Sequence, residues 1–259
     1  MRKTFRSLIE SNQKFVGTIL QIPCPELIEI AAATGCQYII VDNEHSPATY
    51  EQTLAMLRTA DSVGLATMVR IPEVTEDSIK KVLDMGFSAI RVPTVSTAEE
   101  ARQIVRYAKY PPAGERGACP FVRANRFGAV DGATCYEQAN RETVIAVNIE
   151  GPEGLRNMEE IIAVPGIDVI NVGRVDLSVS LGVPGQTRHP LVEKAIRDVG
   201  ALAHKYGKCS GTAADTPEQA AEYRDCPGIT HFLCPIPEQV LVAGYRRIFD
   251  PIREAVNEK

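Results

Sequence analysis

Two carboxylates in the middle of the chain stand where they could bind a divalent cation. Glu150 follows the apolar run AVNI, and Asp176 follows VINVGRV. Short apolar runs bounded by Gly and Pro are typical of strands covered on both faces, as in a parallel sheet, and an amphipathic helix fits between these two. Both acids would then project from the same end of adjacent strands. Because hard divalent cations prefer oxygen ligands, the segment 144–180 predicts a metal site.

Three further polar residues follow other apolar runs and could complete a reaction centre. Asp42 and His45 follow the run at 36–42, and Arg70 closes the run at 65–71. A metal held by two carboxylates has room for a 2-oxo acid and would polarise its carbonyl group as a Lewis acid. Arg70 could hold the same oxygen or the substrate carboxylate, while His45, oriented by Asp42, could transfer protons near neutral pH. No lysine occupies these strand-end positions, which argues against a Schiff base.

Each of these residues has a plainer explanation when it is taken alone. Glu150 could stabilise the start of the next helix, and Asp176 could be the N-cap of the segment LSVS. Arg70 could be an interior ion-pair partner, and His45, close to a proline, could be a loop histidine. The functional interpretation depends on the fold, which must bring all of them together.

Strand and helix patterns alternate along the whole chain. Strands are predicted at 15–20, 36–42, 65–71, 88–93, twice within 144–180, and at 208–213 and 229–235. Helices are predicted at 25–34, 48–63, 75–85, 97–107, 190–206, 217–223 and 237–256. Eight βα units in about 250 residues predict an α/β fold, a single-domain (β/α)8 TIM barrel over residues 1–259, whose active site lies at the carboxyl ends of the strands. An open doubly wound sheet is the alternative, but no GxGxxG follows the first strand.

The alternation breaks between residues 110 and 141, where prolines and glycines are scattered without a clear period. A loop of this length in a compact domain is usually functional or disordered. It contains Arg116, Arg123 and Arg126, which could pair with a carboxylate at the distal end of a substrate. Solvated surface charge is the alternative interpretation of these arginines.

Composition narrows the class of partner. The net charge of −5 and the pI near 5.5 argue against nucleic acid or an anionic membrane surface, which leaves small molecules. Neither a signal peptide nor a run of about 18 apolar residues is recognisable, so we expect a cytoplasmic protein. The seven cysteines are odd in number and form no CxxC pair, which favours buried thiols over a zinc site or disulfides.

Several motifs resemble the HpcH/HpaI family of class II, metal-dependent pyruvate aldolases, and the resemblance covers nearly the whole chain. The motifs are DNEHSP (42–47), VRIP (69–72), RYAKYPPAGERG (106–117), RANRFG (123–128), IEGPEGLRN (149–157) and GRVDLSVSLG (173–182).

The resemblance implies a role for each candidate residue. Glu150 and Asp176 would bind Mg²⁺, Mn²⁺ or Co²⁺, Arg70 would stabilise a pyruvate enolate, and His45 with Asp42 would handle protons. Backbone N–H groups of the segment Gly173, Arg174 and Val175 would hold the pyruvate carboxylate. Arg174 stands where the family usually has proline, and Asn148, where glutamine or methionine is common, would also contact the substrate. A homo-hexamer built as a trimer of dimers is implied too, with exchange of the C-terminal helix between subunits.

The function implied is cleavage of a 4-hydroxy-2-oxo acid to pyruvate and an aldehyde, or the reverse reaction. A citramalyl-CoA or malyl-CoA type lyase is an alternative, but it requires a coenzyme A groove for which the sequence offers no feature. A non-catalytic binding barrel that kept the metal pair is a second alternative. The unusual segment at 173–175 favours it, whereas the presence of His45 and Asp42 argues against it.

Overall fold

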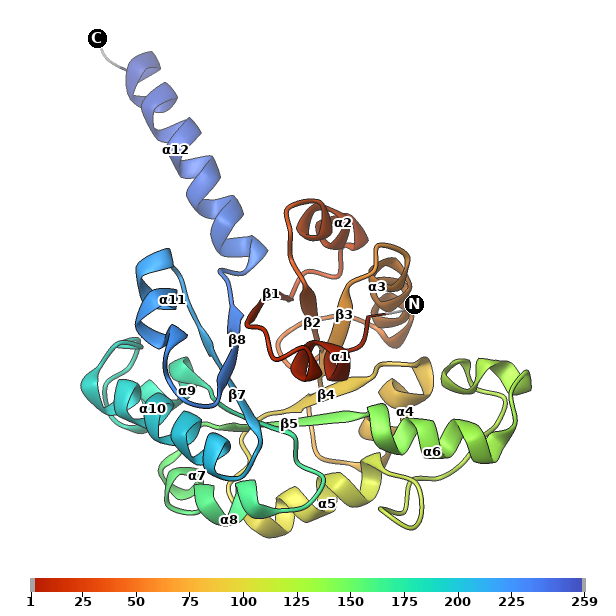
Figure 1. Cartoon of the computed structure of the whole chain (residues 1–259). Coiled ribbons are helices and arrows are strands. Elements are labelled where there is room, and N and C mark those ends of the chain that lie inside the picture. Colours follow the sequence, from red (N-terminus) through yellow and green to blue (C-terminus); the bar gives the residue numbers. More distant parts are fainter. Residues whose placement is uncertain (1–2, 258–259) are drawn as a thin grey trace.

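The computed structural model describes residues 3–257, so the two ends of the predicted 1–259 domain lie outside the described residues. Eight parallel strands follow one another in sequence order and close into a barrel, with helices around it (Figure 1), which confirms the predicted (β/α)8 fold. The strands are β1 (Phe15–Leu20), β2 (Tyr38–Asp42), β3 (Ala66–Arg70), β4 (Ala89–Val92), β5 (Val144–Ile149), β6 (Val169–Val172), β7 (Cys209–Ala213) and β8 (Ile229–Leu233).

The helices begin where the sequence provides a cap. Threonine side chains accept the backbone N–H three residues ahead at the starts of four outer helices, as is usual for an N-cap. The helical elements are α1 (Phe5–Glu10), α2 (Pro25–Ala33), α3 (Tyr50–Ser62), α4 (Glu76–Met85), α5 (Ala98–Ala108), the 3-10 helix η1 (Arg123–Gly128), α6 (Gly132–Glu142), α7 (Pro152–Arg156), α8 (Met158–Ala163), α9 (Arg174–Ser180), α10 (Pro190–Lys205), α11 (Pro217–Arg224) and α12 (Pro237–Asn257).

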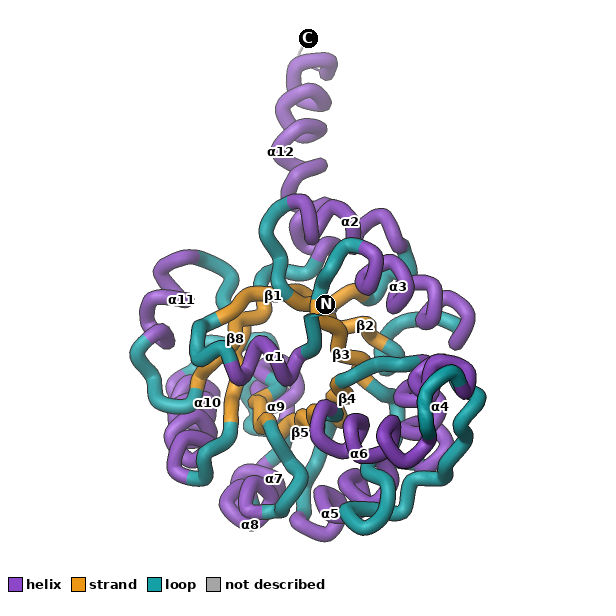
Figure 2. The backbone as a smooth tube through the Cα atoms, turned by 45° about the vertical axis from the view of Figure 1, so that its right-hand side comes forward, coloured by secondary structure: helices purple, strands orange, loops and turns teal. Residues whose placement is uncertain are grey.

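The amino-terminal end of the barrel is filled by an aromatic cluster. Helix α1 lies across this opening (Figure 2), and its Phe5 packs edge-on against Phe15, Tyr38 and His231. Burial, together with the nearby charge of Arg91, lowers the pKa of His231 to about 3, so this histidine is neutral. These four side chains form an apolar plug in the amino-terminal half of the barrel. Any chemistry must therefore take place in the carboxyl-terminal half.

The segment predicted as a long loop at 110–141 is helical in its second half. Helix α6 begins after Asp131, whose carboxylate accepts the N–H of Thr134, and the short η1 precedes it. The prediction was wrong here because α6 contains no buried residue and hence no apolar stripe for periodicity to detect. The whole segment joins the end of α5 to the start of β5, which places it at the amino-terminal face of the barrel.

Helix α12 leaves the barrel instead of covering it (Figures 1 and 2). The predicted helix is present, but none of its residues is buried within residues 3–257. Its exposed apolar side chains are Val240, Leu241, Val242, Tyr245, Ile248, Phe249, Ile252 and Val256. The helix after a barrel strand normally packs on the outside of the barrel. Since α12 points away, no helix of this kind covers the barrel after β8 in the described residues.

No helix in the described part of the chain is long and apolar enough to cross a membrane.

Candidate active site

An ion pair between the ends of β2 and β3 organises the carboxyl face of the barrel. Asp42 and Arg70 are register partners, and Arg70 donates from Nε to Oδ1 at 2.9 Å and from Nη2 to Oδ2 at 2.6 Å. Asp42 also accepts the side-chain amide of Gln21 and the backbone N–H of Glu44. The carboxylate is fully buried and both of its oxygens are engaged, so its role is to orient Arg70.

Both members of this pair are charged at neutral pH. Burial by itself would raise the pKa of Asp42, but the hydrogen bonds and positive charge of Arg70 outweigh it and hold the pKa below its ordinary value. Burial likewise opposes the charge of Arg70, whereas Asp42, Glu44 and Glu150 raise its pKa. The guanidinium is thus a permanent cation fixed at the barrel mouth.

Glu44 links this ion pair to the predicted proton-transfer residue. Its Oε2 lies 3.0 Å from Nη1 of Arg70 and 3.6 Å from Nε2 of His45. Burial, followed by the nearby carboxylates Glu150 and Asp42, raises the pKa of Glu44 against the opposing charges of Arg70 and His45. Asp42 contacts His45 only through the backbone N–H, at 3.4 Å. Within the described residues the imidazole is therefore oriented by Glu44 and not, as we predicted, by Asp42. The sequence could have indicated this role of Glu44, because the residue lies just after the end of β2.

Glu150 directly follows β5 and is held by neutral donors. Thr94 donates its N–H (3.1 Å) and its hydroxyl (2.9 Å) to Oε2, and Asn148 donates its amide to Oε1 at 2.6 Å. Thr94 has a φ of +52°, an unusual conformation for a β-branched residue, and both of its donors face one carboxylate oxygen. Asn148 also accepts from Arg91 at 2.8 Å. Both ends of this amide are engaged, which leaves it little freedom for the predicted substrate contact.

Asp176 does not lie at the end of a strand. Strand β6 ends at Val172, and Asp176 is the exposed third residue of α9, because the GRV segment that reads as strand already belongs to the turn and helix. Arg174 points to the loop after β7, where its Nη2 lies 3.3 Å from Oδ2 of Asp215, and only 10% of its side chain is exposed. The N–H of Gly173 donates to Ile149. Of the predicted carboxylate-binding segment, the N–H groups of Arg174 and Val175 have no backbone partner among the described residues.

Glu150 is the buried carboxylate of this face that suits a divalent cation. Asp42 and Glu44 are committed to Arg70, whereas the described hydrogen bonds to Glu150 come from neutral donors. Gly173 allows the side chain of Glu150 to lie against the backbone, since a Cβ there would stand 2.4 Å from Oε1 of Glu150. Hard oxygen donors with open coordination positions suit Mg²⁺ or Mn²⁺. Residues 3–257 contain no cluster of three or more His, Cys, Asp or Glu side chains suited to a metal, so a cation bound here would take its remaining ligands from water or substrate.

The arginines of the segment 110–141 are at the other end of the molecule. Arg123 pairs with Asp61 at 2.6 Å and Arg116 with Asp84 at 2.6 Å, both acids lying near the carboxyl-terminal ends of outer helices. A segment that follows a helix and precedes a strand must lie at the amino-terminal face of the barrel. The predicted substrate contact of Arg123 is therefore wrong for a substrate bound in its own barrel.

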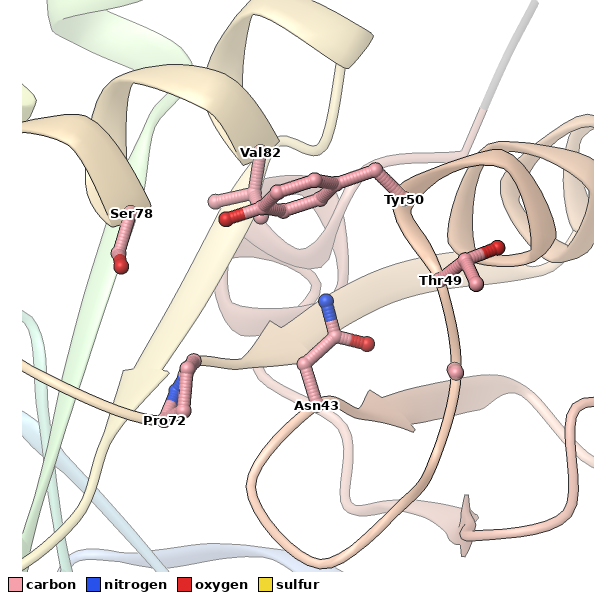
Figure 3. Close-up of a pocket in the computed structure, with 7 residues that line it drawn as sticks. Asn43, Thr49, Tyr50, Pro72, Ser78 and Val82 are labelled. Atoms are coloured by element: carbon pink, nitrogen blue, oxygen red, sulfur yellow. The ribbon is translucent and has the colours of Figure 1, made fainter.

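A cavity of about 350 Å³ lies outside the strands, between the starts of α3 and α4 (Figure 3). Asn43, Tyr50 and Ser78 present polar side chains along it, with Pro72 and Val82 beside them. Neither Arg70 nor Glu150 lines it. The cavity adjoins the loop that carries His45 but is separate from the carboxylate site.

Comparison with known proteins gives a consistent result. The family model described as HpcH/HpaI aldolase/citrate lyase matches residues 20–225. A "5-keto-4-deoxy-D-glucarate aldolase" from Shigella boydii is 35% identical over 219 residues, which cover 85% of this chain and 84% of that protein. A protein of the same name from Escherichia coli O139:H28 is also 35% identical, over 85% of both chains.

Solved structures agree with the sequence comparison. The HpcH/HpaI aldolase from Desulfitobacterium hafniense superposes with a TM-score of 0.90 at 30% identity and covers 97% of both chains. The citrate synthase SbnG has a TM-score of 0.89 at 27% identity, covering 98% of this chain and 99% of that one.

The Asp42–Arg70 pair makes the stability of the protein depend on pH. Because the pKa of Asp42 is lowered in the folded state, its contribution is complete above the ordinary aspartate pKa and is lost as the pH falls through the folded value. We expect Asp42→Asn to lower the free energy of unfolding by about 3 kcal/mol at pH 7, the usual cost of breaking a buried pair. Urea denaturation of both proteins from pH 7 to pH 3 should show this difference shrinking, and a constant difference would contradict the assignment.

Proposed function

Because the chain belongs to the HpcH/HpaI aldolase/citrate lyase family, we propose that it is a divalent-metal-dependent pyruvate aldolase, a carbon–carbon lyase. It cleaves a 4-hydroxy-2-oxo acid to pyruvate and an aldehyde. The observation that carries the proposal is the placement of a fixed guanidinium, Arg70, on the same barrel mouth as Glu150, a buried carboxylate that forms no direct ion pair among the described residues. The named relatives support a hydroxylated sugar-acid substrate of this class.

Glu150 and Asp176 are the residues that would hold the metal, which we propose is Mg²⁺, Mn²⁺ or Co²⁺. When bound, the cation supplies Lewis acidity to the 2-oxo group of the substrate. The carboxylate of the substrate is proposed to lie at the start of α9, where the N–H groups of Arg174 and Val175 point away from the helix. Asn148 supports the site by holding Glu150.

Arg70 stabilises the negative charge that develops on the carbonyl oxygen as the bond between C3 and C4 breaks. Its Nη1 and Nη2 each keep a second N–H beyond those directed at Glu44 and Asp42, and these can donate to the forming enolate oxygen. The fork of Asp42 fixes the guanidinium before the reaction, so little reorganisation is needed at the transition state. Asp42 is thus a positioning residue for Arg70.

His45 handles the proton. In the cleavage direction its imidazole accepts the proton of the C4 hydroxyl, the C3–C4 electron pair moves to C3 as the pyruvate enolate, and the aldehyde leaves. Protonation of C3 then gives pyruvate. Glu44, 3.6 Å from Nε2, stabilises the imidazolium that forms, and the 54% exposure of the His45 side chain leaves it accessible to substrate.

The predicted cytoplasmic location stays a prediction.

We also propose that α12 packs on another copy of the chain in a homo-hexamer, a trimer of dimers. Eight exposed apolar side chains on one helix form a larger apolar surface than a soluble monomer usually presents. The helix that follows β8, α12, does not cover the outside of the barrel. A helix received from a neighbouring copy would cover both surfaces.

Removal of divalent metal should abolish activity. After treatment with EDTA and gel filtration, pyruvate release from a 4-hydroxy-2-oxo acid should fall to background, because no other Lewis acid is available at the carbonyl. Addition of Mg²⁺, Mn²⁺ or Co²⁺ should restore it, as measured by a coupled pyruvate assay. Turnover that resists the chelator would contradict the metal-dependent reaction.

Replacement of the proton-transfer residue should separate two partial reactions. His45→Ala is expected to slow aldol cleavage by about 100-fold or more, the usual contribution of a general base, and to slow exchange of the pyruvate methyl protons with solvent much less. Arg70→Ala should abolish both, since both pass through the enolate. Exchange is followed by proton NMR in deuterium oxide. Equal loss of both reactions in His45→Ala would rule out the assigned role.

Charge placed on α12 should disrupt the assembly. Light scattering after size-exclusion chromatography should give a six-chain mass for the wild type and a smaller species for Phe249→Asp, because a charge cannot be buried in an apolar contact. Arg246→Glu, on the same helix but at a polar position, is the matched control and should keep the wild-type mass. A monomeric wild type would refute the hexamer.

A further inference from the structure

Arg91 is a cation inside the barrel for which the proposed reaction has no use. It lies on β4 beside Arg70 in register, and its Nε donates to Oδ1 of Asn148 at 2.8 Å. That is the one hydrogen bond made by its side chain within the described residues, where no carboxylate approaches it as an ion-pair partner. Burial and the charge of Arg70 lower its pKa. An interior cation without a paired carboxylate is costly, so its presence calls for a function that offsets the cost.

The contact with Arg91 decides which way the amide of Asn148 points. A side-chain amide has a donor end and an acceptor end of nearly the same shape, and either can face a given neighbour. A guanidinium can only donate, so the oxygen of Asn148 must face Arg91. Its Nδ2 then faces the other way, and it lies 2.6 Å from Oε1 of Glu150.

The orientation matters because Glu150 can only accept when it is ionised. Thr94 already fixes Oε2 with two donors, so Asn148 supplies the described hydrogen bond that fixes Oε1. If the amide were reversed, its oxygen would face the carboxylate and repel it. Asn148 is 1% exposed, so solvent does not compete for either end of the amide.

We propose that Arg91 is a positioning residue for Glu150, acting through the amide of Asn148. The chain Arg91–Asn148–Glu150 runs across two neighbouring strands and holds the carboxylate in the orientation that receives a cation. This inference rests on the proposed function in one respect, namely that Glu150 is a metal ligand. Residues that hold a metal ligand in place commonly contribute about 10- to 100-fold to metal affinity.

The test is direct measurement of Mn²⁺ binding to the full chain by electron paramagnetic resonance, without substrate or turnover. Arg91→Met removes the donor, and its dissociation constant for Mn²⁺ should rise by about tenfold or more. Arg91→Lys keeps a cationic donor and should stay within about threefold of wild type. Arg116→Met is the control, because Arg116 is a buried arginine at the opposite end of the barrel, paired with Asp84; it should bind Mn²⁺ as the wild type does.

A double mutant tests the route through Asn148. Asn148→Leu should weaken Mn²⁺ binding, and Arg91→Met in that background should weaken it no further, since residues of one hydrogen-bonded chain are not additive. Wild-type affinity in Arg91→Met, or losses that multiply in the double mutant, would overturn the proposal. If Arg91→Met does not fold, the comparison of Arg91→Lys with Asn148→Leu decides it in the same way. Undiminished Mn²⁺ binding in Glu150→Gln would instead refute the proposed metal site.

Discussion

The ion pair between Asp42 and Arg70 is the interaction on which the carboxyl face of the barrel depends. A buried arginine and a buried aspartate are each expensive, and their attraction repays the cost only when the geometry is good and the remaining hydrogen-bonding groups are satisfied. Here the strand register sets the two residues side by side, the contact is bidentate, and Gln21 with a backbone N–H satisfies the rest. The carboxylate of Glu44 contacts both Arg70 and His45, so a displacement of Arg70 would also displace Glu44 and His45.

This arrangement divides the acids of the mouth into two groups. Asp42 and Glu44 lie against Arg70 and have little charge left to offer a cation. Among the described residues, the carboxylate of Glu150 accepts hydrogen bonds from hydroxyl, amide and backbone donors, which stabilise an anion without neutralising it. A bound cation would therefore be best accommodated beside Glu150, whose side chain lies so close to Gly173 that a Cβ there would clash with it. The chemistry of the site follows from which acids have arginine partners, and not from their number.

The sequence predicted the strands well, since apolar runs bounded by turn residues mark parallel strands clearly; Asp42, Arg70 and Glu150 are where their positions after these runs placed them. Asp176 was misplaced because Val175 extends the apolar run by chance into the next helix. The position of Arg123 could have been inferred, because the segment before β5 follows a helix. The exposure of α12 could not, since an amphipathic helix has the same pattern whether it packs on its own barrel or on another.

The barrel interior is apolar near the amino-terminal ends of the strands and polar near their carboxyl ends. The two halves therefore serve different purposes, stability and function. Aromatic packing around Phe5 and His231 fills the amino-terminal half, where branched or aromatic side chains are the most stable choice. Nearer the carboxyl ends of the strands, the barrel holds Arg91, Asn148 and Asn171, and the Nδ2 of Asn171 is buried with no hydrogen-bond partner among the described residues. Packing alone would not select these residues, because a buried polar group without its full set of hydrogen bonds destabilises the fold. The apolar plug supplies the stability that allows this polar layer to exist, and the polar layer in turn holds Glu150 at a fixed position above it.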